Sequence, residues 1–196
     1  MKKTISKKSA IFLLVFFLLQ TALYAQRAEK KSKSNPLFAG AELLWYPAGF
    51  ITGATAGYYV APKHFISAGI GIDIANRKDF GKNDDEKGTG FGGSLGYRYV
   101  FTPNKSSFFL GARVDLWTMK VNWKDKVGTP QAINGTTKIT IFQPTATVGY
   151  WVKPKNSRFN FLFSAGGGAE INIKTNGKDV GEGGMWLVGT VIYYSL

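Results

Sequence analysis

Few side chains in this sequence could catalyse a reaction or bind a metal ion. The chain of 196 residues contains no cysteine, which excludes disulfides, thiol nucleophiles and thiolate metal sites. Its single histidine, His64, is the only candidate for a histidine general base. Asp84, Asp85 and Glu86 could offer oxygen ligands to a divalent cation, although a solvated loop is the simpler interpretation. We therefore expect no catalytic residue, no metal site and no cofactor.

A glycine-rich segment imitates a nucleotide-binding motif. Residues 88–93, Gly-Thr-Gly-Phe-Gly-Gly, satisfy the spacing G-x-G-x-x-G. That motif binds a pyrophosphate only where it follows a strand and begins a helix. Here an alternating pattern continues beyond the motif, so we interpret the segment as the entry to a strand.

Seven charged residues fall on the polar faces of alternating segments. They are Glu42, Asp73, Arg98, Arg113, Asp115, Glu170 and Lys174. If these faces line the inside of a barrel, the charges must pair, because burying an unpaired charge is costly. We expect Arg113, which shares a strand face with Asp115, to pair with Asp73 and Glu170, and Arg98 to pair with Glu42. The structural interpretation is a polar plug; the functional alternative is a narrow charge-lined path for ions or small solutes.

The elements that position these charges are β-strands, because apolar and polar residues alternate with a period of two. In residues 66–75 isoleucine and alanine occupy one face, whereas serine, glycine and aspartate occupy most of the other, and helical spacing is nowhere sustained. We expect eight strands, at roughly 37–46, 50–60, 65–75, 89–101, 107–123, 137–152, 159–174 and 185–195. Pro144 predicts a bulge or local break in the sixth strand.

The apolar face could point inward, as in a soluble lipocalin-like barrel, or outward toward lipid. Almost no lysine or glutamate interrupts it, and the opposite face is small and glycine-rich. Aromatic residues also gather at strand ends, where membrane barrels place interfacial girdles. We therefore expect an all-β fold, an eight-stranded antiparallel up-and-down transmembrane β-barrel, which is closed because lipid does not tolerate open edges.

Three short turns with proline and lysine follow aromatic strand ends and define one end of this barrel. The expected girdle there is Tyr58, Tyr97, Tyr99, Tyr150, Trp151 and Tyr194. The connections at the other end, 76–87, 125–136 and 175–184, are longer and polar, and only 46–50 is short. Short turns on one side and long loops on the other are typical of outer-membrane barrels, with the turns in the periplasm. An even number of strands then places both termini in the periplasm.

The first residues predict export. Four lysines within the first eight residues precede the apolar run 10–19 and the end 22–25, which contains small residues, as in a signal peptide. The run is too short to span a bilayer as a helix, which needs ~20 residues. We expect cleavage after Ala25, a flexible basic periplasmic tail at 26–36 and the barrel domain at 37–196. The formal charge of +13 could suggest nucleic acid, but an exported chain is not expected to bind it.

Over residues 37–196 the pattern resembles the small eight-stranded outer-membrane β-barrels common in the Bacteroidetes, and the end of the signal peptide, Tyr-Ala-Gln at 24–26, is similar to that group's habit. The resemblance implies a porin-like protein of a Gram-negative cell outer membrane, surrounded by outer-membrane lipid and lipopolysaccharide. It implies a structural role, or an accessory subunit of a larger outer-membrane complex. Such barrels usually end in an aromatic residue; this chain ends at Leu196, which continues the apolar alternation.

Some barrels of this size modify lipid A, using histidine with serine and a carboxylate at the outer end. His64 instead lies in a Pro-Lys turn on the expected periplasmic side, and the chain contains no His-x-Ser sequence. We therefore expect no enzyme. A structural or accessory role is the leading hypothesis, a narrow pore is the alternative, and lipid A modification is the least favoured.

Overall fold

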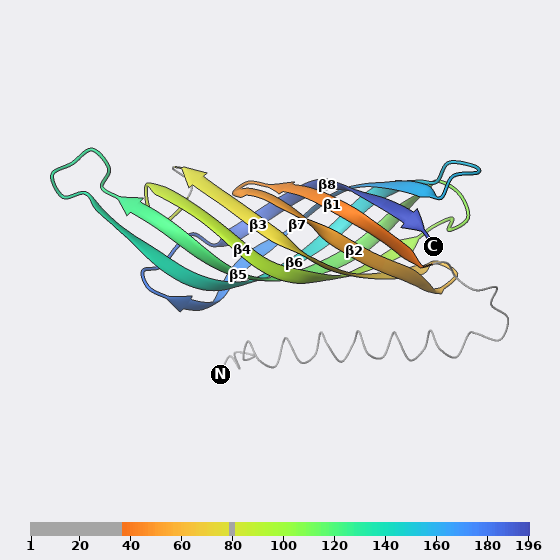
Figure 1. The fold of residues 1–196 in the computed structure, drawn as a ribbon, viewed down its shortest axis with the longest axis horizontal. Coiled ribbons are helices and arrows are strands. Elements are labelled where there is room, and N and C mark those ends of the chain that lie inside the picture. Colours follow the sequence, from red (N-terminus) through yellow and green to blue (C-terminus); the bar gives the residue numbers. More distant parts are fainter. Residues whose placement is uncertain (1–36, 79–80) are drawn as a thin grey trace, which may run out of the picture.

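Eight antiparallel strands form one closed barrel in a computed structural model of the chain (Figure 1). The structure describes residues 37–78 and 81–196, so the expected signal peptide and basic tail lie outside the described residues. The strands are β1 (Phe38–Tyr46), β2 (Gly49–Ala61), β3 (His64–Lys78), β4 (Asp85–Val100), β5 (Ser107–Asp125), β6 (Ile133–Val152), β7 (Phe159–Asn176) and β8 (Gly183–Ser195). Each strand pairs with the next, and β1 pairs with β8. The expected fold class is confirmed.

The two ends of the barrel differ, and we call them the turn end and the loop end. At the turn end the connections are 62–63, 101–106 and 153–158; at the loop end they are 47–48, 79–84, 126–132 and 177–182. Figure 1 shows the β5–β6 hairpin projecting beyond the other strands at the loop end. In the part of the chain that is described, no helix is long and apolar enough to cross a membrane.

The strands run further toward the loop end than expected. Half of the segment 76–87, expected to be a loop, belongs to β3 and β4, where Asn76 pairs with Lys87 and Arg77 with Glu86. The connections themselves are of similar length at the two ends. The difference between the ends therefore comes from strand length, because polar side chains continue the alternation past the apolar surface.

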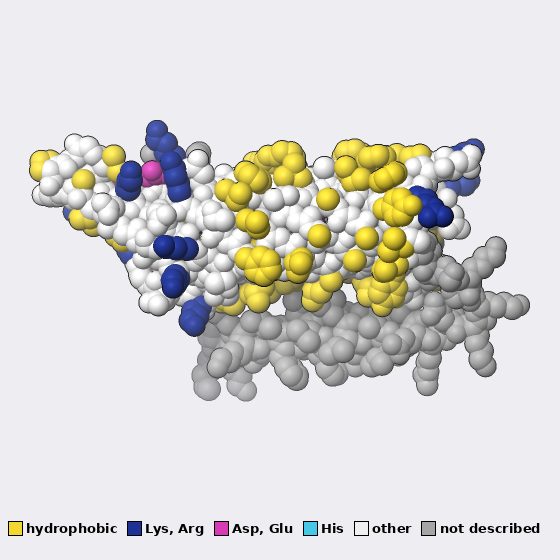
Figure 2. Space-filling view, in the orientation of Figure 1, with side chains coloured by type: hydrophobic (Ala, Val, Ile, Leu, Met, Phe, Trp, Pro, Cys, Tyr) yellow, Lys and Arg dark blue, Asp and Glu magenta, His cyan; other side chains and the backbone are white. Residues whose placement is uncertain are grey.

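Side chains alternate between the lumen and the outer surface along each strand. On β3, Ile70 is 61% exposed whereas Asp73 is fully buried. Outward-facing Phe91, Leu95 and Phe108 are each more than 60% exposed. Figure 2 shows that such residues form an apolar band around the visible face, with Lys and Arg beyond both of its edges. Such a large continuous apolar surface matches the lipid-facing belt of a membrane barrel.

A one-residue bulge interrupts the pairing of β6 with β7. Thr140 pairs with Lys174, but Ile141 pairs with Asn172, so Ile173 is the extra residue. The pairing then passes from Phe142–Ile171 to Thr145–Gly168, which leaves a gap around Pro144. A local break was expected there because proline has no N–H to donate. The bulge lies close to Pro144 but on the neighbouring strand.

Two apolar clusters fill the two ends of the lumen. The turn-end cluster consists of Phe38, Tyr59, Phe65, Val100, Phe109, Trp151, Leu162, Val191 and Tyr193. The loop-end cluster includes Tyr46, Ile51, Trp117, Met119, Ile139, Ile141, Val180 and Leu187. An eight-stranded barrel is just wide enough for its interior to be filled by side chains. The charged residues lie between and beside these clusters.

Candidate functional site

Arg113 lies at the centre of the first lumen charge cluster. Its Nη1 and Nη2 atoms donate to the two carboxylate oxygens of Glu42 at 2.7 and 2.9 Å. Its Nε atom donates to both oxygens of Asp115, at 3.0 and 2.8 Å. All three residues are buried, so a single guanidinium group binds two carboxylates where water is excluded.

The expected partners of Arg113 were wrong. It was expected to bind Asp73 and Glu170, which lie at comparable distances from the turn end. Strand position sets height in the barrel, but the long arginine side chain reaches Glu42 on the wall opposite its own strand. The polar network therefore includes a pair across the lumen in addition to the Arg113–Asp115 pair along β5.

A second cluster surrounds Arg77, which sequence reasoning missed because 76–87 was interpreted as a loop. Its Nη2 atom binds Glu170, and its Nη1 atom donates to the backbone oxygen of Gly181 at 2.7 Å. The Arg77–Glu86 pair has a separation of 3.6 Å. Gln143 donates to the other oxygen of Glu170 at 3.3 Å. Alternation continuing from Asp73 through Arg77 was the signal that could have identified this residue.

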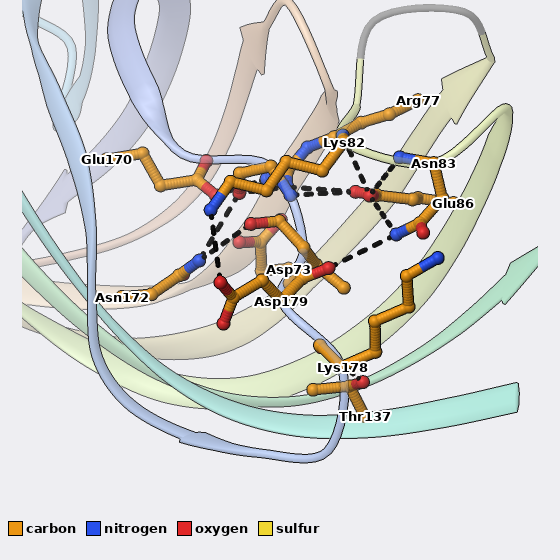
Figure 3. Close-up of polar contacts among 12 residues, drawn as sticks. Asp73, Arg77, Lys82, Asn83, Glu86, Thr137, Glu170, Asn172, Lys178 and Asp179 are labelled. Atoms are coloured by element: carbon orange, nitrogen blue, oxygen red, sulfur yellow. Dashed lines mark hydrogen bonds and ion pairs between the residues drawn. The ribbon is translucent and has the colours of Figure 1, made fainter.

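The loop-end mouth is covered by chain segments bound to this second cluster (Figure 3). Glu86 accepts hydrogen bonds from the backbone N–H of Asn83 and of Gly181, at 3.1 Å each. The amide of Asn83 donates to the backbone oxygen of Asp179 at 3.2 Å. Val180 is buried in the loop-end cluster. Beside these segments a pocket of about 110 Å³ is lined by Tyr46, Arg77, Glu170 and their neighbours.

Asp73 and Arg98 do not take part in the expected ion pairs. Asp73 accepts a hydrogen bond from the hydroxyl of Tyr46 at 2.6 Å. Arg98 was expected to bind Glu42, but it donates to Ser67 at 3.0 Å and lies over the rings of Phe65 and Phe109. Those two rings belong to the turn-end cluster, so Arg98 is positioned by aromatic rings rather than by a carboxylate.

Lys174 is not part of the lumen cluster either, which corrects the expectation. It is exposed and pairs with the outward-facing Thr140. The bulge at Ile173 is the reason, because a shift of one residue turns every later side chain of the strand to the other face. Asn172, which precedes the bulge on β7, still points inward, and its side-chain amide donates to the backbone oxygen of Val180.

Aromatic residues form an outer girdle at the turn end, with one correction. Tyr58, Tyr97, Tyr99, Tyr150 and Tyr194 lie on the outer surface there. Trp151, expected among them, is fully buried in the lumen, because it follows the outward-facing Tyr150 directly and neighbouring residues of a strand point to opposite faces. Trp45 and Trp186 are about half exposed on the outer surface near the loop end. A membrane barrel has its second aromatic girdle at this position.

Trp151 forms part of an aromatic cage around Lys153, in the turn after β6. The Lys153 Nζ atom lies 4.3 Å from the centre of the Trp151 ring and 4.8 Å from that of Tyr59. It also donates to the Tyr59 hydroxyl and to the backbone oxygen of Pro103, at 2.8 and 2.5 Å. Burial lowers the pKa of Lys153 to about 8. This cage covers the lumen at the turn end.

The residues considered for catalysis or metal binding are dispersed. His64 lies at the turn end, with its Nδ1 atom 2.8 Å from the Tyr97 hydroxyl. Glu86 of the acidic run points into the lumen, whereas Asp84 accepts a hydrogen bond from the backbone N–H of Val127. Within 37–78 and 81–196 no group of three or more potential ligand residues is arranged to hold a metal ion. The glycine-rich segment 88–93 lies within β4, as expected.

No protein-family model and no curated protein matches this sequence. Solved structures that match this chain include three bacterial proteins. The N-terminal β-barrel domain of Pseudomonas aeruginosa OprF has a TM-score of 0.50 and 15% identity, and the match covers 83% of this chain and 98% of that one. Neisserial surface protein A has the same TM-score and identity, with 85% and 100% covered. Ail of Yersinia pestis, in complex with the heparin analogue sucrose octasulfate, has a TM-score of 0.40 and 10% identity, with 82% and 97% covered. The chain thus has the fold of the small eight-stranded outer-membrane β-barrels.

Proposed function

We propose that this chain is an integral protein of the cell outer membrane with a sealed lumen, acting structurally or as an accessory subunit of a larger envelope complex. The proposal rests on two ion pairs that cross the lumen. Arg113 on β5 binds Glu42 on β1, and Arg77 on β3 binds Glu170 on β7. In a ring of eight strands each pair joins opposite walls. A barrel braced in two directions is suited to rigidity rather than to transport.

The orientation that we propose places the turn end and both termini in the periplasm. The polar outer surface of β3 to β6 extends beyond the apolar band at the loop end, where it suits water outside the cell. Outer-membrane lipid and lipopolysaccharide are then the immediate surroundings of the barrel. We do not propose an enzymatic role, because His64 lies at the opposite end from the outer leaflet and contacts tyrosine rings.

A narrow pore is the alternative function, and it is favoured by one observation: the lumen contains charged side chains. Their arrangement supports a plug instead. Each of the two arginines in the ion pairs is bound by more than one partner, and aromatic rings fill the turn end. An ion would have to displace both the ion pairs and the rings to pass.

Conductance in planar bilayers tests the sealed lumen. The wild-type protein should give no steps above background. A variant with Trp151→Ala and Phe65→Ala, combined with Arg113→Ala, removes the turn-end rings and one ion pair and serves as the positive control for detection. Regular ion-selective steps from the wild type would overturn the sealed lumen and establish the pore.

Fractionation tests the proposed location. The protein should be recovered with outer membranes, and its migration on a gel should change on heating, as expected for a stable closed barrel. Recovery as a soluble periplasmic monomer without detergent would contradict the proposal. Purification in mild detergent then separates the two roles: an accessory subunit should bring down a stoichiometric partner, and a purely structural barrel should not.

A further inference from the structure

Three lysines form a basic cluster on the outer surface of β5, β6 and β7. Lys120 pairs directly with Lys138, and Lys174 lies diagonally next to Lys138, because it pairs with Thr140. Side chains directly opposite in an antiparallel pair have Cβ atoms about 5 Å apart. All three lysines are exposed. Two like charges in directly opposed positions destabilise a sheet unless an anion binds between them.

No acidic side chain on these strands neutralises the cluster. The carboxylates of β5 to β7 (Asp115, Asp125 and Glu170) lie on the inward-facing side of the sheet. Among the described residues, none of the three lysines forms an ion pair. By comparison, Lys178 nearby binds Asp125 at 2.6 Å. Glu182, in the loop after β7, accepts a hydrogen bond from the backbone N–H of Asn172 beside the bulge, and it forms no ion pair with these lysines. The three positive charges of the cluster therefore have no ion-pair partner among the described residues.

The cluster lies directly at the edge of the apolar band. The row of paired residues Leu116, Phe142 and Ile171 is apolar, and the next row toward the loop end contains Thr118, Thr140 and Lys174. Lys120 and Lys138 form the row after that. Lysine nitrogens and threonine hydroxyls thus replace hydrocarbon within one or two residues. This is the depth at which lipid head groups meet a membrane barrel.

The bulge at Ile173 provides an independent reason to consider this cluster a site. It interrupts the β6–β7 pairing and turns Lys174 from the lumen to the outer face beside Lys138. Bulges redirect a side chain at a local cost to the strand pairing, and they are common next to functional sites. Without the bulge, Lys174 would point into the lumen.

We propose that Lys120, Lys138 and Lys174 bind the phosphate groups of an anionic glycolipid in the outer leaflet, with Thr118 and Thr140 as additional hydrogen-bond donors. The inference rests on the proposed outer-membrane location and orientation. Lysine is a common phosphate ligand, and its charge-assisted hydrogen bonds are stronger than neutral ones. The edge of the apolar band favours a lipid over a free anion, because the acyl chains can lie along Leu116 and Phe142 while the phosphates reach the lysines.

The experiment compares binding of lipid A by the full-length barrel, refolded in detergent, in three forms. They are the wild type, the variant Lys120→Gln/Lys138→Gln/Lys174→Gln, and the control Lys63→Gln/Lys105→Gln/Lys155→Gln, which loses the same charge at the turn end. Retained lipid is measured by native mass spectrometry, and the unfolding temperature by gel migration. The wild type and the control should bind diphosphoryl lipid A and unfold several degrees higher with it. The cluster variant should bind at least about tenfold more weakly.

Three results would each overturn the proposal. They are equal binding by the cluster variant and the wild type, equal binding of lipid A without phosphates, and equally tight binding of soluble pyrophosphate, which would indicate a site for free anions. If the triple variant does not refold, lipid A binding by the single variant Lys138→Gln is compared with that of the wild type. Failure of the proposed function is seen separately, as a wild type that does not fold into a heat-modifiable barrel.

Discussion

Arg113 and Glu42 join opposite walls of the barrel. Two hydrogen bonds of 2.7 and 2.9 Å link the guanidinium group on β5 to the carboxylate on β1, four strands away in either direction around the ring. Paired geometry of this kind adds orientation as well as energy to an ion pair. The number and stagger of the strands set the diameter of the barrel, and this pair links the two opposite walls at that distance.

Removing only the arginine of this ion pair should destabilise the barrel. Arg113→Ala leaves Glu42 and Asp115 buried without their cation, and we expect a loss on the order of 3–5 kcal/mol in the free energy of unfolding. Urea unfolding in lipid vesicles measures it. Adding Glu42→Gln and Asp115→Asn should recover part of the loss. Arg98→Ala is the control, because it leaves no carboxylate unpaired, and a loss as large as that of Arg113→Ala would contradict the account.

Arg77 and Glu86 should hold the loop 177–182 over the mouth of the barrel at the loop end. Arg77 donates to Gly181, and Glu86 accepts from the Gly181 N–H. Arg77→Met should therefore increase amide hydrogen exchange in this loop, while exchange in β8 changes little. Lys178→Ala removes an exposed ion pair with Asp125 and a cation–π contact with Trp123, neither of which involves Gly181, and should have a much smaller effect. Equal exchange in the two variants would show that Arg77 does not retain the loop.

The position of the apolar band predicts where a charge blocks insertion. Ile70→Arg places a charge on the lipid-facing surface, at a cost of roughly 2–4 kcal/mol near the bilayer midplane. Asn76→Arg introduces the same residue on the same face of β3, but beyond the band, and should leave folding into vesicles unchanged. The folded fraction after dilution from urea distinguishes them. Equal folding of both variants would mean that the outward face is not in contact with lipid.

The half-buried Lys153 at the turn end should make stability depend on pH. Burial lowers the pKa of Lys153 from 10.5 to about 8. Between these values the unfolded chain binds more protons than the folded one, so the contribution of Lys153 to stability rises as the pH rises through this window and is constant below it. The difference between wild type and Lys153→Met, measured by urea unfolding from pH 7 to 10.5, isolates this contribution. A difference that does not change with pH would be inconsistent with a shifted lysine.

The bulge predicts which residues of β7 are accessible to water. The chain has no native cysteine, so single cysteines can be labelled without background. Lys174→Cys should react quickly with a water-soluble maleimide in folded barrels, whereas Asn172→Cys, which points inward, should react slowly. The reverse order would place Lys174 in the lumen, as a regular alternation without the bulge predicts.

The strand number, the barrel class and most inward and outward assignments could be predicted from alternation alone. A period of two specifies the face of each residue as long as the strand is regular, and β3 and β5 are regular throughout. The same rule also indicates that Tyr150 and Trp151 must point to opposite faces. Lys174 was misplaced because a bulge leaves no distinct mark in the sequence.

The pairing of charges could not be predicted in the same way. Distance from a turn gives the height of a residue in the barrel, but the partner across the lumen depends on the tilt and stagger of all eight strands. Arg113 therefore reaches Glu42 rather than Asp73. Arg77 and Glu86 were missed because polar outward residues around them look like a loop, although their own alternation continues that of Asp73.

The pairing of β1 with β8 determines when the barrel can first exist. Phe38 pairs with Ser195, so nearly the whole chain must be made before the ring can close, whereas the other strand pairs join neighbours in sequence. Until then, the first and last strands of any partial sheet each have a row of unpaired backbone groups, which a bilayer cannot hydrate. A partly folded chain therefore cannot enter the membrane strand by strand on its own. It must either insert and close in a single cooperative event or be held by another protein that pairs with both free edges until β8 arrives.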